Sequence, residues 1–261
     1  MENKIRSGQS TVEISNNICK KYYDNIVDFT QEKYFTKKIM KVNPSLVPTN
    51  IHFDKTTVTM TSDFAGIKLE EAYKDEIPLE VFYLIISKME TIWNSTENVK
   101  NSYNYKESEF IKYMGDFLLN GYRRVLRSKD IQESYIDKAI IYLYKSLTDI
   151  VATKPKKSLI HLDLSPRNIL IDKNDVKVID WSRAIHGYRV FDIGIMFSKC
   201  RFHEHSEKEK IKQRLEELGE NYDHIVCISN IFDIFRHSKR IDSYKKKENI
   251  EKLIENLYET I

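Results

Sequence analysis

One stretch of the chain constrains its fold more than any other, because it places three polar residues at fixed spacing between apolar runs. Asp163 follows an apolar pair, Asn168 directly precedes an apolar run at 169–171, and Asp180 ends an alternating segment at 176–179. The apolar runs predict two short strands, and the Asp, Lys and Asn residues between them favour a tight turn. A hairpin would therefore bring Asn168 and Asp180 close together, beside Asp163.

Two carboxylates and an amide in this order suit phosphoryl transfer. One carboxylate can orient an attacking hydroxyl and accept its proton, while an amide oxygen and a second carboxylate can hold Mg²⁺ on nucleotide phosphates. The pattern His-x-Asp-x-x-x-x-Asn, followed by a hairpin and an aspartate, is that of the catalytic loop and metal strand of kinases. The sequence thus predicts Asp163 as the catalytic residue, and Asn168 and Asp180 as metal ligands.

On these motifs the chain resembles the aminoglycoside phosphotransferase and choline kinase family, whose members have the protein-kinase-like fold. It departs from ordinary protein kinases at Ser165, where serine/threonine kinases usually have lysine, and at Trp181-Ser182, where they have Phe-Gly. No Ala-Pro-Glu sequence closes an activation segment, and Asp192 follows after only a short interval, as a structural aspartate does in small-molecule kinases. The resemblance is best over residues 159–194.

The resemblance implies an α+β fold with two lobes. Residues 1–66 would form a small N-lobe around an antiparallel sheet, which binds nucleotide and ends in a hinge. Residues 67–261 would form a mostly helical C-lobe with the catalytic loop and the acceptor pocket. Apolar residues at helical spacing support this division. The predicted helices are 28–40, 78–93, 108–127, 135–151, 191–200, 207–218, 222–237 and 246–258.

The resemblance also implies a lysine and a glutamate that fix the nucleotide phosphates. The lysine would lie on a strand at 17–23, and because alternate side chains of a strand face opposite sides, only one of Lys20 and Lys21 can face the nucleotide. We select Lys20, since Ile18 two residues earlier would then line the adenine pocket. Glu32, in the following helix, is the expected partner of this lysine.

Two further segments of the small lobe are predicted to contact the nucleotide. Gly8 lies between two expected strands, where a glycine lets backbone amides approach phosphates, and Ser10 follows it. The segment at Ser62, Asp63 and Phe64 resembles the family's hinge, where backbone groups hydrogen-bond to adenine.

The composition limits the class of protein. Hydrophobic residues make up 41% and charged residues 31% of the chain, which is typical of a soluble globular protein. No apolar run is long enough to span a membrane, and the first residues lack an apolar leader. Three widely spaced cysteines indicate a reducing compartment, and a net charge of +3 gives no reason to expect nucleic acid. We expect a cytoplasmic protein that binds neither membranes nor nucleic acid.

The predicted function is transfer of the γ-phosphoryl group of ATP or GTP, with Mg²⁺, to a hydroxyl of a small molecule. An aminoglycoside-type antibiotic, an amino alcohol or a sugar would be the acceptor. Two alternatives stay open: an atypical protein or lipopolysaccharide-sugar kinase, and a nucleotide-binding pseudokinase scaffold. The sequence does not fix the acceptor, the choice between ATP and GTP, or the oligomeric state, because residues of about 190–240, where the acceptor would bind, carry no recognisable signature.

Overall fold

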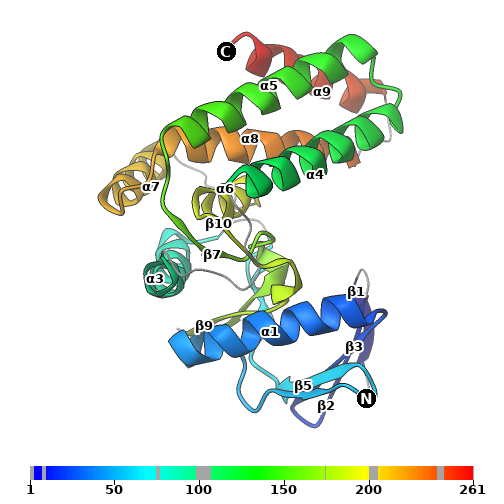
Figure 1. Cartoon of the computed structure of the whole chain (residues 1–261), viewed down its shortest axis with the longest axis vertical. Coiled ribbons are helices and arrows are strands. Elements are labelled where there is room, and N and C mark those ends of the chain that lie inside the picture. The colour runs from blue at the N-terminus through cyan, green and yellow to red at the C-terminus, as the bar shows by residue number, and fades with distance from the viewer. Residues whose placement is uncertain are drawn as a thin grey trace. The chain divides into compact units, whose positions relative to one another are not determined.

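The computed structural model divides into two compact units that interleave along the sequence (Figure 1). The first unit contains residues 1–98, 157–186 and 200–209, and the second contains 99–156, 187–199 and 210–261. This division differs from the predicted lobes at 1–66 and 67–261, which remain a prediction. The structure describes residues 3–7, 10–74, 77–97, 107–173, 175–199, 205–239 and 244–260.

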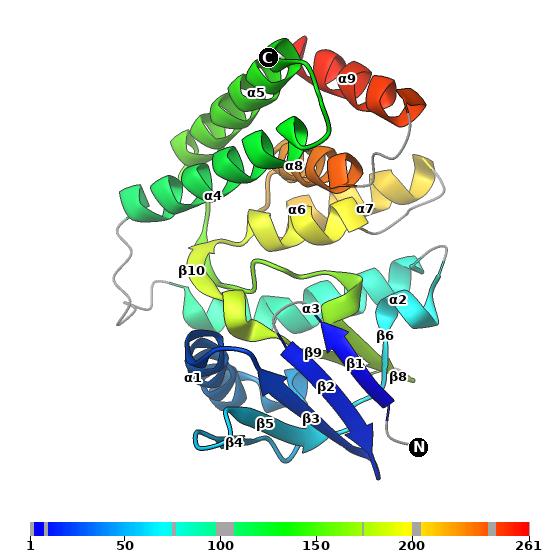
Figure 2. The same ribbon diagram turned by 90° about the vertical axis from the view of Figure 1, so that its right-hand side faces the viewer.

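The first unit begins with an antiparallel sheet of strand order β1-β2-β3-β5-β4 (Figure 2). Asn16 and Asn17 form the turn between β2 and β3 with φ of 48° and 63°, a backbone conformation that asparagine adopts more readily than most residues. In the register of β3 with β5, Lys21 lies opposite Met60. The strands are β1 (Asn3–Ser7), β2 (Ser10–Ser15), β3 (Ile18–Tyr23), β4 (His52–Asp54) and β5 (Thr59–Asp63).

One long helix, α1 (Ile26–Val42), packs against this sheet. It begins after Asn25, whose side chain accepts a hydrogen bond from the Asp28 backbone N–H at 2.8 Å, an N-cap that satisfies one donor of the first turn. Its buried residues recur at helical spacing, and Phe29 joins Tyr23 and Met60 in a hydrophobic cluster. The helix therefore presents one apolar face to the sheet.

The remainder of the first unit contains the predicted catalytic loop. Strand β6 pairs with β8, and β8 pairs with β9, as an antiparallel sheet that contains the predicted hairpin. Gly66 precedes β6 and has a φ of 111°. A Cβ atom added at Gly66 would lie 2.4 Å from the Ile171 carbonyl oxygen. The elements are η1 (Pro44–Leu46), β6 (Ile67–Lys68), α2 (Leu69–Ala72), α3 (Leu79–Thr96), β7 (Lys157–Ile160), η2 (Pro166–Asn168), β8 (Ile169–Asp172), β9 (Asp175–Val178), η3 (Trp181–Arg183) and β10 (Ile185–Tyr188).

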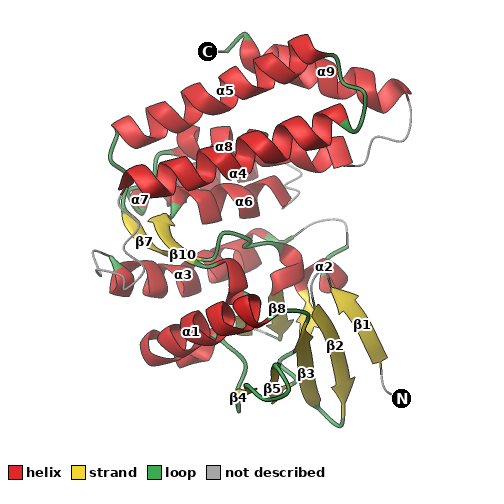
Figure 3. Cartoon of the chain, turned by 45° about the vertical axis from the view of Figure 1, so that its right-hand side comes forward, coloured by secondary structure: helices red, strands yellow, loops and turns green. Residues whose placement is uncertain are grey.

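The second unit is mostly helical (Figure 3). At Gly194 a Cβ atom would lie 2.5 Å from Ile228 Cγ2, so α6 and α8 pack closely. Arg189 and Glu220 form a buried ion pair beside this contact. No helix in the described ranges is long and apolar enough to cross a membrane. The helices are α4 (Glu107–Arg127), α5 (Glu133–Ala152), α6 (Val190–Lys199), α7 (His205–Glu217), α8 (Tyr222–Lys239) and α9 (Tyr244–Tyr258).

Candidate active site

The predicted catalytic loop holds Asp163 through contacts that all lie within the first unit. His161 is fully buried; its Nδ1 accepts a hydrogen bond from the Asp163 backbone N–H at 3.2 Å, and its Nε2 lies 2.9 Å from the Ile179 carbonyl oxygen. Asn168 Nδ2 donates to the Asp163 carbonyl oxygen at 2.8 Å. Leu162 takes a left-handed backbone, with φ of 61°, at the bend before Asp163. The side chains thus fix the backbone that carries the candidate catalytic carboxylate.

The hairpin brings Asn168 and Asp180 to the same end of the β8–β9 pair. The Ile179 N–H donates to the Asn168 carbonyl oxygen at 2.9 Å, which continues the pairing past the end of β9. Asp180 follows with φ of 64° and ψ of 58°, a left-handed conformation that is uncommon for residues other than glycine. Such conformations are strained, so they persist only where the surrounding structure imposes them. They are found most often at functional sites.

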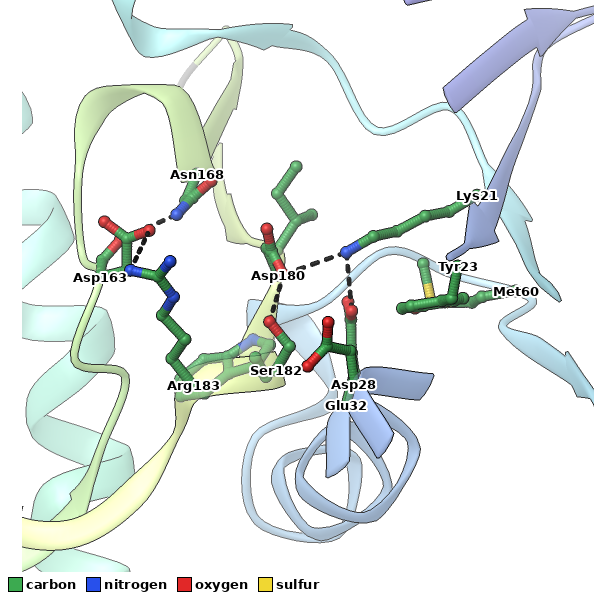
Figure 4. Close-up of polar contacts among 12 residues, drawn as sticks. Lys21, Tyr23, Asp28, Glu32, Met60, Asp163, Asn168, Asp180, Ser182 and Arg183 are labelled. Atoms are coloured by element: carbon green, nitrogen blue, oxygen red, sulfur yellow. Dashed lines mark hydrogen bonds and ion pairs between the residues drawn. The ribbon is translucent and has the colours of Figure 1, made fainter. Parts of the chain in front are cut away.

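A buried lysine connects the sheet, α1 and the hairpin (Figure 4). Lys21 Nζ donates to Glu32 Oε2 at 2.7 Å and to Asp180 Oδ1 at 3.0 Å. Its side chain is only 9% exposed. Ser182 Oγ donates to the same Asp180 oxygen at 2.8 Å. Glu32 therefore pairs with a lysine of β3, as predicted, but the lysine is Lys21, which also contacts Asp180.

The prediction that Lys20 is the partner of Glu32 is wrong. Neighbouring residues of β3 face opposite sides, and Lys21 lies on the same face as Tyr23, which packs against α1. Lys20 lies on the other face with Ile18, whose side chain is 49% exposed. The choice failed because it assumed that Ile18 faces a covered pocket.

Charge pairing governs ionisation in this network. Burial opposes the charged form of Lys21, but Glu32 and Asp180 outweigh it and raise the pKa of the lysine above its ordinary value. Burial raises the pKa of the Glu32 carboxyl, and Lys21 offsets only part of that effect. Burial also opposes ionisation of Asp180, yet Lys21, the Ser182 hydroxyl and His161 together lower its pKa to about 2. Asp180 is therefore a carboxylate at neutral pH.

The chemistry of Asn168 and Asp180 fits a hard divalent cation, which prefers oxygen ligands. Because the Asn168 amide nitrogen donates to the Asp163 carbonyl oxygen, the amide oxygen is the atom that can serve as a ligand. At Asp180, Lys21 and Ser182 both donate to Oδ1, so Oδ2 is the oxygen that could bind a cation.

The predicted hinge contributes internal contacts. The Asp63 carboxylate accepts hydrogen bonds from Thr49 Oγ1 at 2.8 Å and Asn50 Nδ2 at 2.7 Å. The Phe64 N–H donates to the Asn17 carbonyl oxygen at 2.8 Å, and the Asp63 N–H donates to the Thr49 carbonyl oxygen at 3.0 Å. Ser62 is buried in β5. These donors hold the end of the sheet, and contacts of Ser62, Asp63 and Phe64 with adenine stay a prediction.

The predicted phosphate-contacting turn is described only in part. Ser10 is buried at the start of β2, where it pairs with Tyr23 of β3. Gly8 lies outside the described residues. Nucleotide binding by Gly8 and Ser10 stays a prediction.

Two arginines that the sequence-based prediction did not include lie at Asp163. Arg167 Nη2 is 2.8 Å from Asp163 Oδ2, and Arg183 Nη1 is 3.9 Å from the same oxygen. Figure 4 shows the Arg183 side chain reaching toward Asp163. Arg167 lies inside the predicted catalytic motif, directly before Asn168, so its position in the sequence indicated that it lies near Asp163. No local pattern pointed to Arg183.

Comparison with known sequences relates part of the chain to phosphotransferases. Residues 115–223 match the model of a family described as the phosphotransferase enzyme family. A curated relative, calcium-dependent protein kinase 27 of Arabidopsis thaliana, is 33% identical over 92 residues, which cover 33% of this chain and 19% of that protein. The chain thus matches about a fifth of the length of this relative.

Solved structures show the same fold over nearly the whole chain. A choline/ethanolamine kinase family protein from Mesorhizobium loti has a TM-score of 0.69 at 12% identity, with 99% of this chain and 88% of that chain covered. A thermostable mutant of aminoglycoside phosphotransferase APH(4)-Ia, in complex with ADP and hygromycin B, has a TM-score of 0.59 at 12% identity, covering 100% and 94%. Aminoglycoside 2'-phosphotransferase-IIIa, in complex with GDP, has a TM-score of 0.61 at 14% identity, covering 100% and 93%.

These comparisons confirm the resemblance to the aminoglycoside phosphotransferase and choline kinase family. They also confirm the predicted α+β class with the protein-kinase-like fold. The family match supports the prediction of a phosphotransferase enzyme with an alcohol group as acceptor.

Proposed function

From the match to the phosphotransferase enzyme family and the protein-kinase-like fold, we propose that this chain is a small-molecule kinase. It transfers the γ-phosphoryl group of ATP or GTP to a hydroxyl of a small acceptor in the cytoplasm. The observation that carries the proposal is the network of Lys21, Glu32 and Asp180 at the end of the hairpin that also places Asn168 next to Asp163.

Lys21 replaces Lys20 as the residue that binds the nucleotide phosphates. Its ammonium is held by two carboxylates, so it stays charged and fixed in position. Glu32 orients the lysine from α1. A fixed positive charge of this kind stabilises the negative charge on transferring phosphate oxygens without reorganising during the reaction.

Asn168 and Asp180 are the residues that would hold Mg²⁺. The ionised Asp180 and the oriented Asn168 amide supply oxygen ligands from one end of the hairpin. When bound, Mg²⁺ neutralises charge on the nucleotide phosphates. The ADP and GDP in the structures of the two aminoglycoside phosphotransferases support a purine nucleotide as donor.

Asp163 orients the acceptor hydroxyl and receives its proton. The contacts of His161 and Asn168 to the loop backbone hold this carboxylate in one position. Most of the rate acceleration then comes from positioning and charge stabilisation, because the transition state of phosphoryl transfer is loose.

The test is nucleotide consumption with Mg²⁺ against a panel of aminoglycosides, choline, ethanolamine, sugars and a generic protein substrate. We expect acceptor-dependent turnover, which Asp163→Asn lowers by roughly 100-fold or more because the proton acceptor is lost. Asp149→Asn, at an exposed position of α5, is the matched control and should retain full turnover.

Three results would contradict the proposal. Full turnover in Asp163→Asn would remove this residue from catalysis. Turnover of protein alone would favour a protein kinase, the activity that the name of the Arabidopsis thaliana relative gives. Tight nucleotide binding without any transfer would favour a pseudokinase scaffold.

A further inference from the structure

The two arginines at Asp163 place positive charge where the acceptor hydroxyl would lie. Arg167 comes from η2 and Arg183 from η3, two short turns that are separated in sequence by the hairpin. Both guanidinium groups approach the same oxygen of Asp163, at 2.8 Å and 3.9 Å. The candidate catalytic carboxylate is thus flanked by cations from two different elements.

The exposure of these side chains leaves part of each guanidinium group accessible to a ligand. The Asp163 side chain is 12% exposed, whereas Arg167 is 54% and Arg183 is 60% exposed. A guanidinium group has several N–H donors in a planar fork, and one contact to a carboxylate oxygen uses only part of that fork. The exposed remainder can bind a second carboxylate or a phosphate in bidentate fashion.

Arg167, Arg183 and Asp163 together carry a net charge of +1, because two guanidinium groups share one carboxylate. Asp163, Asp180 and Glu70 are the acidic groups that act on Arg167. Asp180 shares Lys21 with Glu32, whereas Asp163 is itself shared by both arginines. A positively charged acceptor would therefore be repelled at short range from Asp163, and an anionic acceptor would be attracted.

We infer that the acceptor carries an anionic group, a carboxylate or a phosphate, close to the hydroxyl that is phosphorylated, and that Arg167 and Arg183 bind this group. The inference rests on the proposed kinase function and narrows its substrate class. In the transfer, the bond between the γ-phosphorus and the bridging oxygen of the nucleoside diphosphate breaks. A bond from the acceptor oxygen to that phosphorus forms, and the hydroxyl proton passes to the Asp163 carboxylate.

A binding experiment tests the anionic subsite without requiring turnover. The protein is saturated with the Mg²⁺ complex of AMP-PNP and titrated by calorimetry with glycerate, glycerol 3-phosphate, glycerol and choline. We expect both anions to bind at least about 10-fold more tightly than glycerol. One charge-assisted hydrogen bond raises the affinity by about 10-fold or more. Choline should bind more weakly than glycerol.

Arginine variants connect the selectivity to these residues. Arg167→Gln and Arg183→Gln should each weaken binding of both anions by about 10-fold, and leave the affinity for AMP-PNP within about 2-fold. Arg127→Gln is the matched control, because Arg127 is also 60% exposed and also contacts a carboxylate, that of Glu133. It should change neither affinity.

Three results would overturn the inference. The first is a lack of binding by both anions, or equal binding of glycerol or choline. The second is anion binding that survives both arginine variants. The third is a similar loss of AMP-PNP affinity in these variants, which would assign the arginines to the nucleotide phosphates.

Turnover separates this inference from the proposed function. If the anions bind through the arginines but no hydroxyl compound is phosphorylated, the kinase function fails and the anionic subsite stands. If choline or an aminoglycoside is phosphorylated through Asp163 and the arginine variants have no effect, the kinase function stands and the anionic acceptor is wrong. Phosphorylation of an acidic peptide but not of small anions would also overturn the small-molecule acceptor.

Discussion

Lys21 and Lys20 show that the surroundings of a side chain, and not its type, determine its role. Lys20 has the same side chain as its neighbour Lys21 but faces the opposite side of β3. There the Lys20 ammonium lies 4.9 Å from the centre of the Tyr22 ring. Lys21 instead contacts Glu32 and Asp180 in a buried site. A buried ion pair is costly to break, because the remaining partner keeps an uncompensated charge away from water.

The two lysines therefore form a matched pair of variants. Lys21→Met should lower the free energy of unfolding by about 3 kcal/mol and abolish turnover, because Glu32 and Asp180 lose their shared cation. Lys20→Met should change the free energy of unfolding by less than about 0.5 kcal/mol. Urea unfolding and nucleotide consumption measure both effects. Equal behaviour of the two variants would contradict the assignment of Lys21.

At the scale of elements, the hairpin β8–β9 is connected to the rest of the first unit through β6 and α3. Backbone pairing joins Ile67 of β6 to Ile171 of β8. On the other side of the hairpin, Asp175 contacts Lys88 of α3 at 2.8 Å and Lys177 of β9 at 2.9 Å. The hairpin thus positions Asn168 and Asp180 relative to both neighbours.

The approach of β8 to residue 66 requires glycine. Gly66→Ala should destabilise the protein by about 1–3 kcal/mol, because the new Cβ would meet the Ile171 carbonyl at 2.4 Å on a backbone with φ of 111°. Gly115→Ala in α4 is the control: nothing lies within 4 Å of its Cβ position, and alanine favours a helix by about 0.5–1 kcal/mol. Chemical denaturation should give opposite signs for the two variants. A neutral Gly66→Ala would contradict the close approach.

The ion pairs of Asp175 predict a pH dependence. Burial opposes ionisation, but Lys88 and Lys177 lower the pKa of Asp175 to about 2 from an ordinary value near 3.8. A lowered folded-state pKa means that the contribution to stability is complete above about pH 4 and disappears as the pH falls toward 2. Asp175→Asn should therefore be less stable than the native chain at pH 6, by less than about 1 kcal/mol at this exposed site. The difference should vanish near pH 2.

Acid titration of the free energy of unfolding measures this difference. Asp149→Asn, at an exposed position of α5, is the control and should change the free energy of unfolding by less than about 0.5 kcal/mol at pH 6. A difference between Asp175→Asn and the native chain that stayed constant down to pH 2 would show that these ion pairs do not titrate as expected.

At the scale of the whole molecule, the first unit is assembled from segments far apart in the sequence. The Leu159 N–H donates to Thr96 Oγ1 at 2.9 Å, and the network of Lys21 is completed by Asp180. Residues 157–186 therefore belong to the same compact unit as residues 1–98. Of the helices of the second unit, α4 and α5 lie between these two segments in sequence, and α6, α8 and α9 follow residue 186.

A fragment of residues 1–98 should accordingly fail as an independent unit. It lacks β8, which pairs with β6, and Asp180, which pairs with Lys21. We expect no cooperative thermal unfolding and no Mg²⁺-dependent nucleotide binding by this fragment, because the strands and carboxylate that complete the unit are missing. The full chain is the positive control. Cooperative unfolding of the fragment with nucleotide affinity equal to that of the full chain would contradict this account.

The sequence alone determined the features that depend on local patterns. The hairpin, the α1 helix and the positions of Asp163, Asn168 and Asp180 follow from strand alternation, turn residues and helical spacing, all of which operate within a few residues. The choice of Glu32 came instead from the resemblance to the phosphotransferase family, and Glu32 does pair with a lysine of β3. Short-range patterns suffice for these features because the physical forces behind them act between near neighbours in the chain.

Only the tertiary structure decided between Lys20 and Lys21 and placed Arg183 beside Asp163. Two neighbouring side chains of a strand face opposite sides. Which elements cover each side depends on parts of the chain that are distant in sequence. The same holds for the charge around Asp163, which comes from two turns separated by a hairpin. Electrostatic contacts depend on distance in space, and the sequence records that distance only where the two residues are close along the chain.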